Sequence, residues 1–261
     1  MRNGFDGVRL GITSGEGPLD DIAEELTGER LDLAAVIAES KREVIDHLLP
    51  AEVRRLGTEL LAHGEHRVDR VDVTPNSAQA VLTAFLLEMP VYRTYARGCR
   101  DAPAADVAVI DQVRDRVLER HDDLDPVLVD LVAELLRGPL DDEFGVRFRT
   151  RFQQTSGPVM AKGVEDTAFY RFGRLVSLND VGSDPARFGS SLDDFHAAQV
   201  RAAADEPLRM VGSSTHDSKR SEDVRARISV LAEAPAMWRD TVRRLDARAA
   251  ALAVGPRDRQ L

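Results

Sequence analysis

Two neighbouring polar side chains that could act together, His216 and Asp217, follow a short apolar run at residues 208–212. The run predicts a strand, and (β/α)8-barrel enzymes carry their catalytic groups at the carboxyl ends of strands. A fixed carboxylate beside an imidazole could bind hydroxyl groups and stabilise developing positive charge. However, Ser214, Thr215 and Asp217 are also typical of a turn that caps the next helix. Spacing alone leaves both interpretations open.

A second group of polar side chains is concentrated in residues 157–172, GPVMAKGVEDTAFYRF. Carboxylates and guanidinium groups form hydrogen bonds with hydroxyls, and an aromatic ring can cover the face of a sugar. A surface segment with ion pairs explains the same composition about equally well. The candidates for contact with a sugar are Lys162, Glu165, Asp166, Tyr170 and Arg171.

The elements that must position these residues are predicted to be mostly helical. Apolar residues recur with a helical period, and Thr74–Pro75 and Asp125–Pro126 are typical helix starts. In contrast, VYRTY at residues 91–95 alternates β-favouring residues and predicts a short strand. The expected helices cover residues 31–48, 51–62, 74–89, 109–117, 125–138 and 191–203, with two more around Ala234–Pro235.

Composition excludes several classes of function. The chain has 261 residues and a net charge of −10, which makes nucleic acid an improbable partner. Cys99 is the only cysteine and the histidines lack the spacing of a zinc site, so no metal is expected. We find neither a long apolar span nor an apolar leader, and therefore expect no membrane association and a cytoplasmic location.

Three motifs together resemble the maltooligosyltrehalose synthase family of the α-amylase superfamily: residues 151–172, VYRTY and residues 213–228. Looser likeness at EELTGE and SKREV extends the resemblance over nearly the whole chain. Members of the family are isomerases that convert the reducing-end α-1,4 bond of a malto-oligosaccharide to an α,α-1,1 bond without a cofactor. The implied partners are malto-oligosaccharide or glucan and a trehalose-releasing hydrolase of the same pathway.

The resemblance also assigns roles to individual residues. Asp217 would be the carboxylate that stabilises the transition state, and His216 would form hydrogen bonds with sugar hydroxyls beside it. Lys219 and Arg220 would belong to the loop that lines the acceptor side. Of the three carboxylates expected for this chemistry, Asp217 alone is assigned in this chain.

The regions that carry the nucleophile and the general acid in the family are not found. The nucleophile region has Arg, one residue and then Asp, whereas Arg9 is followed by Leu10 and Gly11. We therefore expect a fragment that is inactive alone and would need a matching N-terminal half. The expected fold is mainly α with a few β-strands: a helical insertion domain at residues 1–140, then later strands and helices of an incomplete (β/α)8 barrel at residues 141–261.

Two other functions stay open. A non-catalytic helical module would bind glucan or a partner chain without turnover. A hydrolase of the α-amylase type would share the His-Asp pair but would not be expected to contain GPVMAKGVEDTAFYR.

Overall fold

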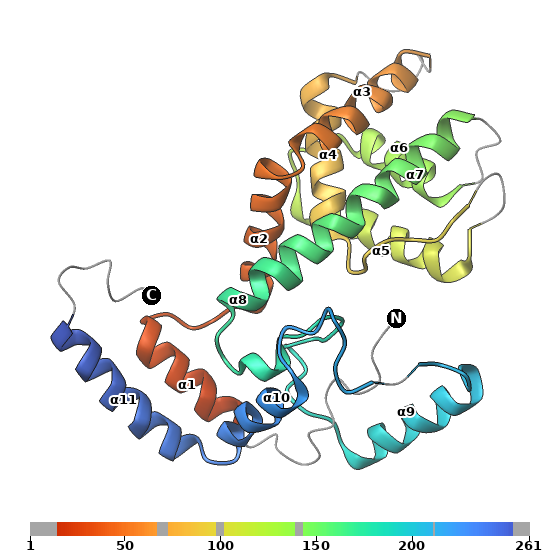
Figure 1. The fold of residues 1–261 in the computed structure, drawn as a ribbon. Coiled ribbons are helices and arrows are strands. Elements are labelled where there is room, and N and C mark those ends of the chain that lie inside the picture. The colour runs from red at the N-terminus through yellow and green to blue at the C-terminus, as the bar shows by residue number, and fades with distance from the viewer. Residues whose placement is uncertain (1–14, 67–72, 98–101, 139–142, 211, 253–261) are drawn as a thin grey trace. The chain divides into compact units, whose positions relative to one another are not determined.

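The computed structural model describes residues 15–66, 73–97, 102–138, 143–210 and 212–252 (Figure 1). The chain divides into two compact units. We call residues 34–168 the central unit, and residues 1–33 with 169–261 the split unit. The predicted domain boundary at residue 140 stays a prediction. The expected loss of the nucleophile at Arg9–Gly11 falls outside the described residues.

The central unit is a helical bundle built around α4. Its elements are α2 (Leu33–His47), α3 (Pro50–His66), α4 (Pro75–Glu88), α5 (Ala104–Arg120), α6 (Pro126–Arg137), α7 (Glu143–Pro158) and the π-helix η2 (Val159–Ala168). Helices α3, α5 and α6 all pack against α4. Helix α4 can be central because every residue from Val81 through Leu86 is buried and all but Thr83 are apolar.

Local signals fix the ends of the helices as the sequence predicts. The Thr74 hydroxyl accepts the Ser77 N–H at 3.1 Å, and the Ser77 hydroxyl accepts the Thr74 N–H at 2.9 Å, so the first turn of α4 is capped reciprocally. Asp125 caps α6 by accepting the Val127 N–H at 2.9 Å. These caps satisfy backbone donors that would otherwise lack helical partners.

The split unit has a smaller core. Its helices are α1 (Glu16–Thr27), α8 (Phe169–Arg171), α9 (Leu192–Asp205), α10 (Glu222–Ser229) and α11 (Pro235–Leu252), with short 3-10 turns η3 (Val176–Leu178) and η4 (Val230–Ala232). Leu19 and Ile22 of α1 pack with Leu175, Leu178 and Phe188. Helix α9 buries no side chain, whereas α1 and α11 are joined by Arg243, which donates to Glu25 at 2.5 Å.

The predicted β-strands and the barrel part at residues 141–261 are wrong for the described chain, which contains helices and no strand. Residues 91–95 are irregular, and two of their backbone groups bind side chains instead of a neighbouring strand. The Ser156 hydroxyl donates to the Tyr92 carbonyl at 2.8 Å, and Asp106 accepts the Tyr95 N–H at 2.5 Å. The described part of 208–212 is equally irregular: Leu208 and Met210 are exposed, and the β-type feature among the described residues is an isolated bridge at Ser190.

Candidate functional site

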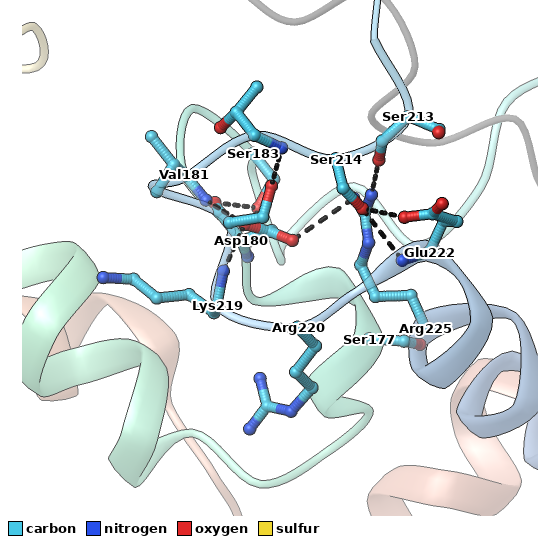
Figure 2. A network of polar contacts seen from close by, with 12 residues as sticks. Ser177, Asp180, Val181, Ser183, Ser213, Ser214, Lys219, Arg220, Glu222 and Arg225 are labelled. Atoms are coloured by element: carbon cyan, nitrogen blue, oxygen red, sulfur yellow. Dashed lines mark hydrogen bonds and ion pairs between the residues drawn. The ribbon is translucent and has the colours of Figure 1, made fainter.

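The loop that carries His216 and Asp217 is a tight turn just before α10. The Ser218 hydroxyl accepts the Thr215 N–H at 3.0 Å, and the Ser218 N–H returns to the Thr215 carbonyl at 3.2 Å. At the base of the loop, the Glu222 N–H donates to the Ser214 hydroxyl at 2.9 Å, and that hydroxyl donates to the Glu222 carboxylate (Figure 2). The hydrogen bond from Ser214 lowers the pKa of the Glu222 carboxyl.

His216 and Asp217 lie at the tip of this turn and face solvent. Their side chains are 89 % and 67 % exposed, and His216 Nε2 lies 3.3 Å from Asp217 Oδ2. The pair can therefore offer one hydrogen-bonding surface to a ligand. Water weakens its electrostatic effect in the free chain, because the interaction of charges falls steeply as the local dielectric rises.

Lys219 and Arg220, next along the loop, lie beside Tyr170. The Lys219 Nζ atom is 6.0 Å from the centre of the Tyr170 ring, and the Arg220 guanidinium carbon is 5.9 Å from it. These distances are within the range of cation–π attraction. Tyr170 is 62 % exposed, so an aromatic face flanked by two cations is open to a ligand. Three of the predicted site residues thus come together from positions about 50 apart in sequence.

Arg220 is also held at its guanidinium, where Nη1 donates to the Val176 carbonyl at 3.2 Å. This bond fixes the side chain near the turn that follows Tyr170. Arg171, the neighbour of Tyr170 in α8, is exposed.

The remaining predicted residues lie in the central unit, on the π-helix η2. Lys162 and Asp166 form an exposed ion pair at 2.7 Å, and this hydrogen bond raises the pKa of the Lys162 ammonium. Glu165 is buried and accepts the Tyr92 hydroxyl. The wider turn is visible at Thr167, whose hydroxyl donates to the Lys162 carbonyl five residues earlier at 2.9 Å. π-Helical turns are rare and are frequent at functional sites.

The π-helix packs closely on α2 at Gly163. A Cβ atom added there would lie 2.9 Å from Lys41 Cα and 3.2 Å from Lys41 N. Lys41 is itself buried, and its Nζ donates to the Leu87 carbonyl at 2.9 Å and the Met89 carbonyl at 2.7 Å. Lys41 therefore binds the end of α4, while its backbone supports η2. Desolvation lowers the pKa of Lys41 to about 8.

Two buried polar residues of the split unit were not singled out from the sequence: Asn179 and Asp180. They lie in SLNDVGSD, inside the long irregular stretch whose polar and glycine-rich composition is typical of functional loops. Their burial would have identified them, because a buried Asp needs hydrogen-bond or charge partners, but burial cannot be derived from the local sequence. Figure 2 shows Asp180 at the centre of a polar network with Lys219 and Arg225.

Two kinds of feature are absent from the described residues. No group of three or more side chains among them is arranged to hold a metal ion. No helix in the described ranges has the length and apolar character needed to cross a membrane.

Comparison with known proteins gives a consistent group of relatives, although no family model matches the chain. A Mycobacterium tuberculosis protein named "Putative maltooligosyl trehalose synthase" is 35 % identical over 226 residues, which are 86 % of this chain and 26 % of the relative. The chain thus spans about a quarter of the length of this relative.

Two solved structures extend the comparison. The maltooligosyltrehalose synthase of Arthrobacter ramosus matches 99 % of this chain and 30 % of its own length, with 36 % identity and a TM-score of 0.79. A "hypothetical maltooligosyl trehalose synthase" of Sulfolobus tokodaii matches 94 % of this chain and 29 % of its own length, with 25 % identity and a TM-score of 0.67. The helical arrangement described above is therefore similar to one segment of larger proteins.

Proposed function

Since this chain is homologous to a segment of maltooligosyltrehalose synthase, as its motifs indicated, we propose that it supplies malto-oligosaccharide-binding and transition-state-stabilising residues to an intramolecular glucosyl transfer. The transfer converts the α-1,4 bond at the reducing end of the substrate to an α,α-1,1 bond. Superfamily membership, the cytoplasmic location and a trehalose-releasing hydrolase as the next enzyme belong to the same proposal.

The single observation that carries the proposal is the exposed Tyr170 ring beside Lys219 and Arg220, which lie on the same loop as Asp217. An aromatic face suits the apolar face of a glucose ring, and the cations can donate to its hydroxyl oxygens. A surface salt-bridge cluster would not require an exposed aromatic ring at its centre. The arrangement therefore favours a sugar over a purely structural role.

Glycosyl transfer of this class passes through a transition state with oxocarbenium character, and a carboxylate stabilises the positive charge that develops. We assign this role to Asp217, and assign to His216 the hydrogen bonds that orient hydroxyls beside it. Tyr170, Lys219 and Arg220 would hold the neighbouring sugar. Binding of substrate would remove water from Asp217 and so strengthen its interaction with the developing charge.

The π-helix residues are proposed as additional contacts with the substrate. Lys162 and Asp166 are exposed and can exchange their mutual ion pair for hydroxyl partners at small cost, because exposed ion pairs contribute little stability. Arg171 is exposed and remains a predicted contact. Glu165 also remains one, although its carboxylate accepts the Tyr92 hydroxyl in this structure.

The test is an exchange of segments. This chain would replace the matching segment of a full-length synthase, and conversion of maltopentaose would be followed as loss of reducing ends. We expect activity in the composite enzyme, and loss of substrate affinity when Tyr170→Ala is introduced. Arg187→Ala, which changes an exposed cation elsewhere in the split unit, serves as the control. Unchanged affinity with Tyr170→Ala would contradict the proposal.

For the isolated chain we propose a second function, binding of glucan without turnover. Asp217 is the only residue assigned to the chemistry, whereas retaining transfer also needs a nucleophile and a general acid about 5 Å apart. We expect the 261-residue chain to bind maltopentaose without forming a non-reducing product. Detection of that product above a buffer control would contradict this expectation.

A further inference from the structure

The neighbouring residues Asn179 and Asp180 are almost completely buried in the split unit, with 1 % and 4 % of their surfaces exposed. Burying an amide and a carboxylate is unfavourable unless each has hydrogen-bond or charge partners. The partners of the two residues lie in different parts of the candidate site. Because the two residues are adjacent in the chain, they connect these two parts, which neither residue could do alone.

Asn179 holds the segment that carries Tyr170. Its Nδ2 atom donates to the Phe169 carbonyl at 2.8 Å and to the Phe172 carbonyl at 2.6 Å. These two carbonyls lie on either side of Tyr170 in the chain. The amide of Asn179 thereby fixes the backbone from which the exposed ring projects.

Asp180 holds the loop that carries Lys219. Its Oδ1 atom accepts the Lys219 N–H at 3.0 Å, and its Oδ2 atom lies 3.2 Å from Arg225 Nη1. Arg225 also donates to the Ser213 carbonyl, so the other end of the loop is tied to the same carboxylate (Figure 2). Asp180 accepts the Val181 N–H at 2.8 Å as well, which orients its own side chain.

We propose that Asn179 and Asp180 are positioning residues that set the spacing between the Tyr170 ring and the Lys219–Arg220 cations, and thereby the affinity of this surface for a glucose ring. Neither residue touches the sugar. The inference rests on the proposed function for the identity of the ligand, but the spacing itself can be measured without any ligand. Because Asn179 binds the segment of Tyr170 and Asp180 binds the loop of Lys219, loss of either set of hydrogen bonds would let the ring and the cations move apart.

The experiment uses the 261-residue chain, with nuclear magnetic resonance to follow three signals. These are amide hydrogen exchange at Lys219, the ring resonances of Tyr170, and titration with maltopentaose. The variants are Asp180→Ala, Asp180→Asn and Asn179→Ala. The matched control is Asp184→Asn, which changes an exposed carboxylate in the same loop that accepts the Ala186 N–H at 3.0 Å.

Each variant has its own expected result. Asp180→Ala removes the acceptor of the Lys219 N–H, so protection of that amide should fall at least about tenfold and affinity for maltopentaose about tenfold. Asp180→Asn keeps an acceptor oxygen of the same size and should restore most of the protection. Asn179→Ala should shift the Tyr170 resonances and weaken binding while Lys219 stays protected. Asp184→Asn should resemble the native chain in all three signals.

The outcomes separate a positioning role from a structural one. If Asp180→Ala and Asn179→Ala lower the unfolding midpoint but leave binding and both local signals unchanged, the proposal is wrong. If Asp180→Ala fails to fold, Asn179→Ala decides, because unchanged Tyr170 resonances with unchanged affinity would overturn the proposal. Absence of maltopentaose binding by the native chain would contradict the proposed function, and the Lys219 and Tyr170 signals would still decide the positioning role.

Discussion

Asp217 lies at the tip of an exposed turn, so its role in catalysis can be separated from any role in folding. We predict that Asp217→Asn in the composite enzyme lowers kcat at least about a hundredfold, corresponding to about 3 kcal/mol of transition-state stabilisation, with little change in KM. Asn keeps the size and turn-forming tendency of Asp but not its charge. Steady-state kinetics on maltopentaose provide the measurement. The control is Asp223→Asn, which changes an exposed residue in the first turn of α10 and should leave kcat nearly normal. Equal kcat values for the two variants would show that Asp217 only forms the turn.

Lys41 provides a pH-dependent prediction, because desolvation lowers its pKa to about 8 in the folded chain. The unfolded value is near 10.4, so between about pH 8 and pH 10.4 the unfolded chain holds more of this proton, and stability rises with pH. The contribution of Lys41 deprotonation to the free energy of unfolding should reach at most about 3 kcal/mol above pH 10.4. It should be lost as the pH falls through 8.

Urea unfolding of the native chain and of Lys41→Met across this range provides the measurement. The difference between their free energies of unfolding should change with pH in this direction. Lys162→Met, which alters an exposed lysine, should run parallel to the native chain. If the Lys41→Met curve is parallel as well, Lys41 does not titrate as described.

At the residue scale, the motifs named candidate side chains but not their arrangement, and contact of these side chains with a substrate stays a prediction. Tyr170, Lys219 and Arg220 were selected from motifs, and the structure places them together. Their spacing depends on Asn179 and Asp180, whose contacts span up to 45 positions, from Asp180 to Arg225. Such long-range contacts leave no period or motif in a single sequence.

At the scale of elements, Gly163 makes the π-helix sensitive to a single methyl group. We predict that Gly163→Ala destabilises the central unit by about 1–3 kcal/mol, because the new Cβ would meet the backbone of Lys41, which cannot rotate away. Gly57→Ala in α3 is the matched control. Its Cβ would meet the flexible Gln79 side chain at 3.3 Å, and the higher helix propensity of Ala, by about 1 kcal/mol, should offset this contact. Thermal unfolding of both variants gives the comparison, and equal midpoints would contradict the close packing at Gly163.

The helices were predictable because their signals are local, as the caps at Thr74 and Asp125 show. The predicted strands were wrong because a strand is stable only when another strand pairs with it. The alternation in VYRTY does not indicate whether such a partner exists. In the structure, Ser156 and Asp106 bind the backbone of this segment in place of a neighbouring strand, and Gln153 binds the carbonyl of Ala96, the residue after it. The π-helix was also unpredictable, since no period of apolar residues signals its wider turn.

At the scale of the whole molecule, the two units have separate cores of unequal size. We predict that the split unit unfolds at lower urea concentration than the central unit, because it buries less apolar surface and α9 buries none of its side chains. Trp238, the only tryptophan, packs against the core of the split unit and reports on it alone. Its fluorescence should change before most of the far-ultraviolet circular dichroism is lost. Coincident transitions would show that the two units unfold as one.

The three lysines of the chain have very different surroundings: Lys41 is buried, Lys162 is in an exposed ion pair, and Lys219 lies beside Tyr170. Chemical acylation of amines should therefore give a simple peptide map. Lys41 has the lowered pKa that favours attack on a reagent, yet its burial should keep it unmodified in the folded chain. Lys162 and Lys219 should react, and maltopentaose should protect Lys219. One mass-spectrometric experiment could then report both the folding of the central unit and the occupancy of the candidate site.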